Sequence, residues 1–177
     1  MSLEKARDPL VPLCFDTSAI FGKVSFASFL GRVRRTFPAR RLILPAWVVA
    51  ERSRQLHEEY GNQFDAAVVR AAVTSPDLGL DVVPFDQDVA LGAWLRATAL
   101  RGERSWAWRP GVTQPCGERC RSGDYVVLAT AVAHSALLVT DDGQQADQAR
   151  ELIGIIGRKE LDDLVRSLST STESGFP

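Results

Sequence analysis

Carboxylates stand beside the most apolar segments of this 177-residue chain. Asp124 precedes a long apolar run, Asp141 and Asp142 follow a short one, and Asp16 follows another. Glu51 shares a helical face with apolar residues three and four positions before it. Charged groups are rarely held against a protein core without a partner, and a metal ion is one such partner. The positions of these acids therefore predict a metal site.

The ligand type indicates what such a site would do. Carboxylate oxygens suit hard ions such as Mg²⁺ and Mn²⁺, and no histidine stands at these positions, which argues against zinc. Two such ions about 3.5–4 Å apart activate a water molecule and stabilise the leaving oxygen in phosphodiester cleavage. Each acid taken singly is more simply a helix cap or a solvated charge. The set favours a metal site, and it consists of Asp16, Glu51, Asp124 and Asp142, with Asp141 as the alternative to Asp142.

The segment 122–133 must position Asp124. It is almost entirely apolar from Tyr125 onward, which is typical of a buried helix. Ser122 is a suitable N-cap, and Asp124 then falls in the first turn, where the helix dipole favours a carboxylate. A short buried strand is predicted over 137–139, with the acidic pair beyond its carboxyl end.

Short strands alternate with helices along the whole chain. Strands are predicted over 12–15, 41–44, 80–85, 137–139 and 152–156, and helices over 25–36, 45–59, 62–73, 86–100, 122–133, 144–151 and 159–168. The alternation is typical of an α/β fold with a parallel β-sheet sandwiched between helices. Pro84 must stand at a strand end or on an edge, because proline cannot donate a hydrogen bond within a sheet. Active sites in such sheets lie beyond the carboxyl ends of the strands, where Asp16 and the acidic pair are expected.

A chain of this length is expected to form one domain, over residues 1–168. Residues 1–11 are expected to be a loose leader, and 169–177 a polar, disordered tail. Residues 102–121 show no hydrophobic period and are predicted to be an insert. A structureless loop of that length is uncommon in a compact domain and often functional.

Four segments resemble, in order along the chain, the motifs of the PIN-domain nuclease family, and most closely those of the VapC-like toxin ribonucleases. They are Leu13-Cys-Phe-Asp-Thr-Ser-Ala19, Pro45-Ala-Trp-Val-Val-Ala-Glu51, the run from Asp124 to Ala131, and Leu138-Val-Thr-Asp-Asp142. The resemblance implies a PIN-like fold and a metal-dependent endoribonuclease that cleaves RNA with Mg²⁺ or Mn²⁺. It also implies the toxin role in a toxin–antitoxin pair. The family places its last acid two residues after the threonine, which implies Asp142 rather than Asp141.

Hydroxyl side chains neighbour two of the acids. Thr17 and Ser18 either orient Asp16 or a bound water, or serve only as turn formers, and Thr140 has the same two explanations. His57 and His134 stand at helix ends, where surface roles are more natural than catalysis.

The insert 102–121 is rich in side chains that suit RNA. Aromatic rings stack on bases and arginines hold phosphates, so the insert is a candidate RNA-contacting lid. Its candidate contacts are Trp106, Trp108, Arg104, Arg109 and Arg121. The alternative is a surface loop whose tryptophans pack on the core or on a partner. Cys116 and Cys120 are more simply a pair of thiols than zinc ligands, because two ligands do not close a zinc site.

Composition limits the partners. The net charge of -1 excludes a globally basic nucleic-acid binder, and no apolar run approaches the roughly 20 residues that span a bilayer. The first residues lack the apolar core of a signal peptide, and three cysteines are too few for a disulfide framework. We expect a cytoplasmic protein without membrane contact.

Other classes remain to be weighed against a nuclease. A HAD-type phosphatase needs a second aspartate two residues after Asp16, where Ser18 stands, and no glycine-rich phosphate loop occurs. The main alternative is a non-catalytic PIN-fold binding or assembly module, and the presence of all four acids counts against it. The family also implies an antitoxin or complex partner and a homodimer, for which Phe26 and Phe29 suggest an apolar surface.

Overall fold

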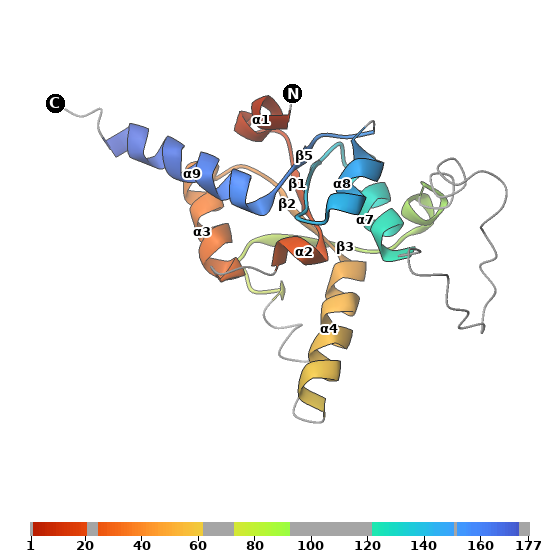
Figure 1. The fold of residues 1–177 in the computed structure, drawn as a ribbon. Helices are drawn as coiled ribbons and strands as arrows, with labels where there is room; N and C mark the ends of the chain where they lie inside the picture. The colour runs from red at the N-terminus through yellow and green to blue at the C-terminus, as the bar shows by residue number, and fades with distance from the viewer. Residues whose placement is uncertain (1, 21–24, 62–72, 93–121, 151, 174–177) are drawn as a thin grey trace, which may run out of the picture.

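A computed structural model describes residues 2–20, 25–61, 73–92, 122–150 and 152–173 (Figure 1). Its centre is a five-stranded sheet in the order β3-β2-β1-β4-β5, and every neighbouring pair of strands is parallel. The strands are β1 (Leu13–Phe15), β2 (Leu42–Pro45), β3 (Leu80–Val83), β4 (Leu137–Val139) and β5 (Ile155–Ile156). The predicted α/β fold with a parallel sheet is confirmed.

Helices cover both faces of this sheet. They are α1 (Ser2–Arg7), α2 (Thr17–Ile20), α3 (Phe26–Thr36), α4 (Ala46–Tyr60), α7 (Ser122–Ala133), α8 (Gly143–Ala149) and α9 (Arg158–Glu173). Figure 1 shows α3 and α9 together on one side of the strands and α7 on the other, while α4 projects away from the body. In the described part of the chain, no helix is both long and apolar enough to cross a membrane.

Asp16 and the acidic pair follow the central strand β1 and its neighbour β4. β1 and β4 are buried along their whole length, as continuous apolar strands in parallel sheets usually are. Their register pairs Phe15 with Val139, so both strands end side by side. The backbone N–H of Asp16 donates to the carbonyl of Val139 at 3.0 Å, which brings Asp16 next to Thr140.

Local signals placed several boundaries correctly. Ser25 caps α3 by accepting a hydrogen bond from the backbone N–H of Ser28, as the sequence predicts. Asp124 lies in the first turn of α7, and β3 is an edge strand that ends just before Pro84. Cap chemistry and proline geometry act within a few residues, so the sequence alone fixes them.

The apolar residues proposed for a dimer surface pack into or against the core. Phe29 is fully buried, and Phe26 is half-buried against the main core. Both rings meet Phe15 edge-on, with centroid separations of 6.2 Å for Phe29 and 5.5 Å for Phe26. Phe26 and Phe29 therefore do not form the exposed apolar surface on which the homodimer prediction was based.

The predicted loose leader is wrong over α1. Arg40, which is almost fully buried, donates hydrogen bonds to the carbonyls of Lys5, Ala6 and Asp8 and holds this short helix against the core. The tail prediction is also wrong over 169–173, because α9 continues to Glu173. Strand β5 is shorter than predicted. The helix predicted over 62–73 and the insert 102–121 lie outside the described residues, apart from Val73.

Candidate metal centre

Asp16 is held through one of its two carboxylate oxygens. Its Oδ2 accepts hydrogen bonds from the Ser18 backbone N–H at 3.1 Å, the Ser18 hydroxyl at 2.6 Å and the Thr140 hydroxyl at 3.0 Å. The residue is only 5% exposed. Within the described residues, nothing donates to Oδ1. The carboxylate is therefore fixed in orientation and keeps one oxygen for a ligand.

Ser18 and Thr140 also connect Asp16 to the acidic pair after β4. Their hydroxyl oxygens lie 3.1 Å apart. The backbone N–H of Asp141 donates to the Ser18 hydroxyl at 2.9 Å, and that of Asp142 donates to the Thr140 hydroxyl at 3.1 Å. The two hydroxyls thus join the carboxyl ends of β1 and β4 into one network.

Thr17 holds Glu51. Its hydroxyl donates to Glu51 Oε2 at 2.5 Å, across the contact between α2 and α4. Thr17 is buried and Glu51 is half-buried. The sequence predicted that Thr17 either orients Asp16 or a bound water, or serves only as a turn former, and in the structure its hydroxyl bonds to Glu51 instead. Glu51 is thereby tied to the residue that follows Asp16.

Each member of the acidic pair caps a different helix. Asp142 Oδ1 accepts from the backbone N–H groups of Gln144 at 2.9 Å and Gln145 at 3.2 Å, at the start of α8. Asp141 Oδ1 accepts from the backbone N–H of Arg158 at 2.8 Å, at the start of α9. Asp141 thus caps α9 and Asp142 caps α8. Of these two helices, α8 is the one that contacts Asp124.

Gln145, which no sequence motif indicated, links α8 to Asp124. Its amide nitrogen lies 3.4 Å from the backbone carbonyl of Asp124, and the side chain is buried. Its Oε1 is also buried and meets no donor among the residues described. A glutamine three positions after a helix cap usually bonds back to the cap, so local pattern predicts a different partner. The fold instead turns it toward α7.

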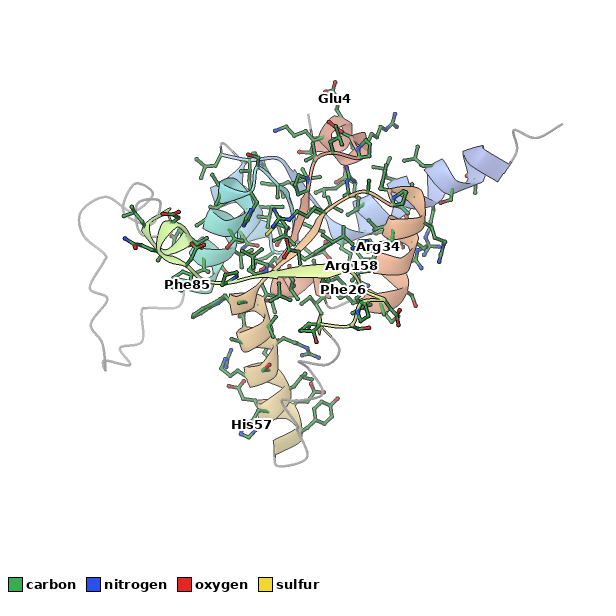
Figure 2. The ribbon with its side chains drawn as sticks, turned by 180° about the vertical axis from the view of Figure 1, so that it is seen from behind. Glu4, Phe26, Arg34, His57, Phe85 and Arg158 are labelled. Atoms are coloured by element: carbon green, nitrogen blue, oxygen red, sulfur yellow. The ribbon has the colours of Figure 1, made fainter. Side chains whose placement is uncertain are left out.

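Arg158 is a second residue that sequence reasoning missed. Its buried guanidinium donates to the carbonyls of Ala19 at 3.0 Å and Ile20 at 3.1 Å, at the end of α2. It lies over the rings of Phe29 and Phe26, with the charged carbon 5.1 and 5.9 Å from the centroids. Figure 2 labels Arg158 next to Phe26. Burial lowers the pKa of Arg158, and the charges of Asp141 and Asp162 act against that shift.

The position of Arg158 matters because α2 carries Thr17 and Ser18. The guanidinium binds the last residues of α2. The first two residues of the same helix, Thr17 and Ser18, bind Glu51 and Asp16. In the sequence, Arg158 stands beside Lys159 and Glu160 and looks like a solvated helix start. No local signal distinguishes it from its exposed neighbours.

The residues present fit a hard cation that keeps much of its water. Asp16 keeps a carboxylate oxygen that accepts no hydrogen bond in the described part of the chain, and carboxylate oxygens suit a hard cation. Among the described residues, no three acidic, histidine or cysteine side chains stand close enough to enclose an ion. Mg²⁺ is usually held by one or two carboxylates and several waters, so a closed protein cage is not required.

The other predicted residues lie away from this network or beyond the described ranges. His57 is near the far end of α4, which Figure 2 shows projecting from the sheet, and the ring of His134 faces Arg41. Cys14 is buried in β1, and burial raises the pKa of its thiol. The candidate RNA contacts and the insert cysteines lie outside the described residues: Trp106, Trp108, Arg104, Arg109, Arg121, Cys116 and Cys120.

Comparison with known proteins agrees with the topology. A family model described as "PIN domain" matches residues 13–151. Among solved structures, the crystal structure of FitAcB from Neisseria gonorrhoeae is similar, with a TM-score of 0.53 and 17% sequence identity. The match covers 83% of this chain and 98% of that one. At this identity the likeness concerns the fold alone. No curated protein matches the chain.

Proposed function

This chain belongs to the PIN-domain family, and from that premise we propose that it is a metal-dependent endoribonuclease. Asp16, Glu51, Asp124 and Asp142 are the proposed ligands of Mg²⁺ or Mn²⁺, directly or through water. A bound divalent ion would activate water and stabilise the leaving oxygen of the phosphodiester. The observation that carries the proposal is the asymmetric environment of Asp16, with one oxygen fully bonded and the other left open.

The protein's own contribution is the positioning of the acids. Ser18 and Thr140 fix the Asp16 carboxylate, and Thr17 fixes Glu51. Hydrogen-bonded supports of this kind set the orientation and basicity of metal-binding groups. Sites built this way lose activity when a ligand moves by as little as 1 Å.

The biological setting is part of the proposal. A toxin acting against RNA, with an antitoxin as partner, is the role that the motif resemblance favours. The insert 102–121, with Trp106 and Trp108, is proposed to contact the RNA. The alternative is a PIN-fold module that binds partners without cleaving them, and it makes no use of the open oxygen on Asp16.

A cleavage assay tests the proposal. The purified protein is incubated with unstructured and structured RNA in Mn²⁺ or in EDTA. Asp16→Asn keeps the shape of the side chain but removes its charge, and we expect cleavage to fall about a hundredfold or more. The matched control is Asp77→Asn, which changes an exposed aspartate in the turn before β3 and should leave cleavage unchanged.

Binding of the ion is measured separately from cleavage. Mn²⁺ should raise the melting temperature of the wild-type protein by mass action, and raise that of Asp16→Asn less. Cleavage that persists in EDTA, or that survives Asp16→Asn, contradicts the nuclease assignment. A melting temperature that Mn²⁺ leaves unchanged contradicts the metal site and favours the binding module.

A further inference from the structure

Trp47 is an exposed aromatic residue next to the candidate metal centre. Its side chain is 37% exposed, although it lies in the first turn of α4 beside the buried Val48. Residues four apart share a helix face, so Trp47 lies one turn before Glu51 on the same side of α4. The spacing corresponds to about 6 Å along the helix axis.

Contact with α7 fixes the indole in place. A Cβ on Gly123 would collide with the Trp47 indole nitrogen and come within 3.1 Å of two further ring atoms. The ring therefore lies against backbone that only glycine leaves open, directly before Asp124. Trp47 thus lies between the helix that carries Glu51 and the helix turn that carries Asp124.

The other exposed aromatic residues in the described part of the chain do not share this position. Tyr60 is the last residue of α4, about 20 Å along the helix from Trp47. Phe85 follows the edge strand β3. Among the described residues, only Trp47 combines an exposed ring with close contact to the helix turn that carries Asp124.

A partly exposed indole next to the proposed cleavage site suits an unpaired nucleobase. Bases in single strands can turn outward and stack on aromatic side chains, whereas bases in a duplex are already stacked on their neighbours. Carboxylates repel the phosphates of a nucleic acid, and stacking supplies affinity that does not depend on charge. We propose that Trp47 stacks on an unpaired base beside the scissile phosphodiester. This inference rests on the proposed function.

Binding is measured without cleavage, using a fluorescein-labelled oligouridylate and a labelled RNA duplex in EDTA. Trp47→Leu keeps an apolar side chain against Gly123 but removes the aromatic face. We expect it to weaken single-strand binding about tenfold, the lower part of the range for one lost stack. Trp47→Phe should restore most of the affinity, and the matched control Tyr60→Ala should bind like the wild type.

The outcomes separate this inference from the nuclease assignment. If Trp47→Leu binds the oligouridylate as tightly as wild type, or if wild type prefers the duplex, the stacking role is overturned. An equal loss in Trp47→Leu and Tyr60→Ala overturns it as well. If Trp47→Leu binds the oligouridylate more weakly than wild type, but wild type never cleaves RNA in Mn²⁺, stacking is supported and the nuclease assignment fails.

Discussion

The hydroxyl of Thr17 donates a hydrogen bond of 2.5 Å to Oε2 of Glu51, a residue 34 positions later in the chain. Thr17 directly follows Asp16, so the bond ties an acid on α4 to the end of β1. Glu51 is only half-buried and would otherwise sample several rotamers at the edge of the site. Removal of this bond should therefore lower both the cleavage rate and the stability of the fold.

Thr17→Val tests that relationship, because valine keeps the shape of threonine without its donor. We expect the rate of RNA cleavage to fall about tenfold and stability to fall by about 1.5–3 kcal/mol, the usual range for a hydrogen bond to a charged group. The matched control is Thr36→Val, whose hydroxyl lies 3.1 Å from that of Ser169 on the surface. Cleavage by Thr17→Val at the wild-type rate would show that Glu51 needs no such support.

Asp142 combines a structural role with its proposed metal role, and two substitutions separate them. Asparagine keeps an oxygen to cap α8, so Asp142→Asn should unfold in urea close to wild type. Asp142→Ala loses the cap and should cost about 1 kcal/mol. Both variants should lose cleavage, because neither has a carboxylate.

Asp86 provides the control for the capping effect. Its side chain accepts from the backbone N–H of Val89 at 2.9 Å, at the start of the helical turns 87–92. Asp86→Ala should lose stability as Asp142→Ala does and keep full cleavage. Efficient cleavage by Asp142→Asn would mean that Asp142 is only a cap.

Arg158 should be needed for both stability and cleavage. Arg158→Met keeps a long apolar stem over the two phenylalanine rings but leaves the carbonyls of Ala19 and Ile20 without their donor. We expect a loss of about 2–4 kcal/mol in urea unfolding, since buried acceptors then lack a partner. Cleavage should fall even where the variant is fully folded, because α2 positions Thr17 and Ser18.

Two further variants make the Arg158 prediction specific. Arg158→Lys restores one donor and the charge, and it should recover part of the stability and of the cleavage rate. Lys159→Met alters the exposed neighbour and should change neither. A folded Arg158→Met protein that cleaves like wild type would restrict Arg158 to a purely structural role.

Asp162 gives the fold a predictable dependence on pH. It joins α3 to α9, because its carboxylate pairs with Arg32 at 2.7 Å and with Arg166 at 2.9 Å. Burial alone would raise the pKa of Asp162, but the hydrogen bonds and charges of both arginines outweigh it and lower the pKa. A carboxylate with a depressed folded-state pKa stabilises the protein above its unfolded pKa, and that stability is lost as pH falls through the folded pKa.

Asp162→Asn should therefore be less stable than wild type at neutral pH, by about 1 kcal/mol. The difference should shrink as the pH falls below about 4, where the unfolded chain begins to bind the proton. Thermal melts across the pH range measure this, with Asp163→Asn as the exposed neighbouring control. A difference that is constant from neutral to acidic pH would assign the effect to packing rather than to charge.

The sequence by itself determined where the acids emerge and which elements carry them. The apolar run before Asp16, the helix start at Asp124 and the cap at Ser25 are local patterns, and the structure follows each of them. Such signals act within a few residues, through side-chain period, capping and the dipole of the first turn. The order of the strands along the chain was likewise enough to predict a parallel sheet.

The tertiary structure decided which side chains meet. Thr140 bonds to Asp16 across 124 positions, and only the β1–β4 register brings them together. Long-range packing also turned Thr17 toward Glu51 and buried Phe29 and Arg158. It also lets Arg40 hold α1, a helix that the sequence of residues 1–11 did not indicate. Hydrogen bonds between distant segments form only where the sheet brings the ends of its strands together. A sequence pattern does not contain the spatial distance between residues that are far apart along the chain.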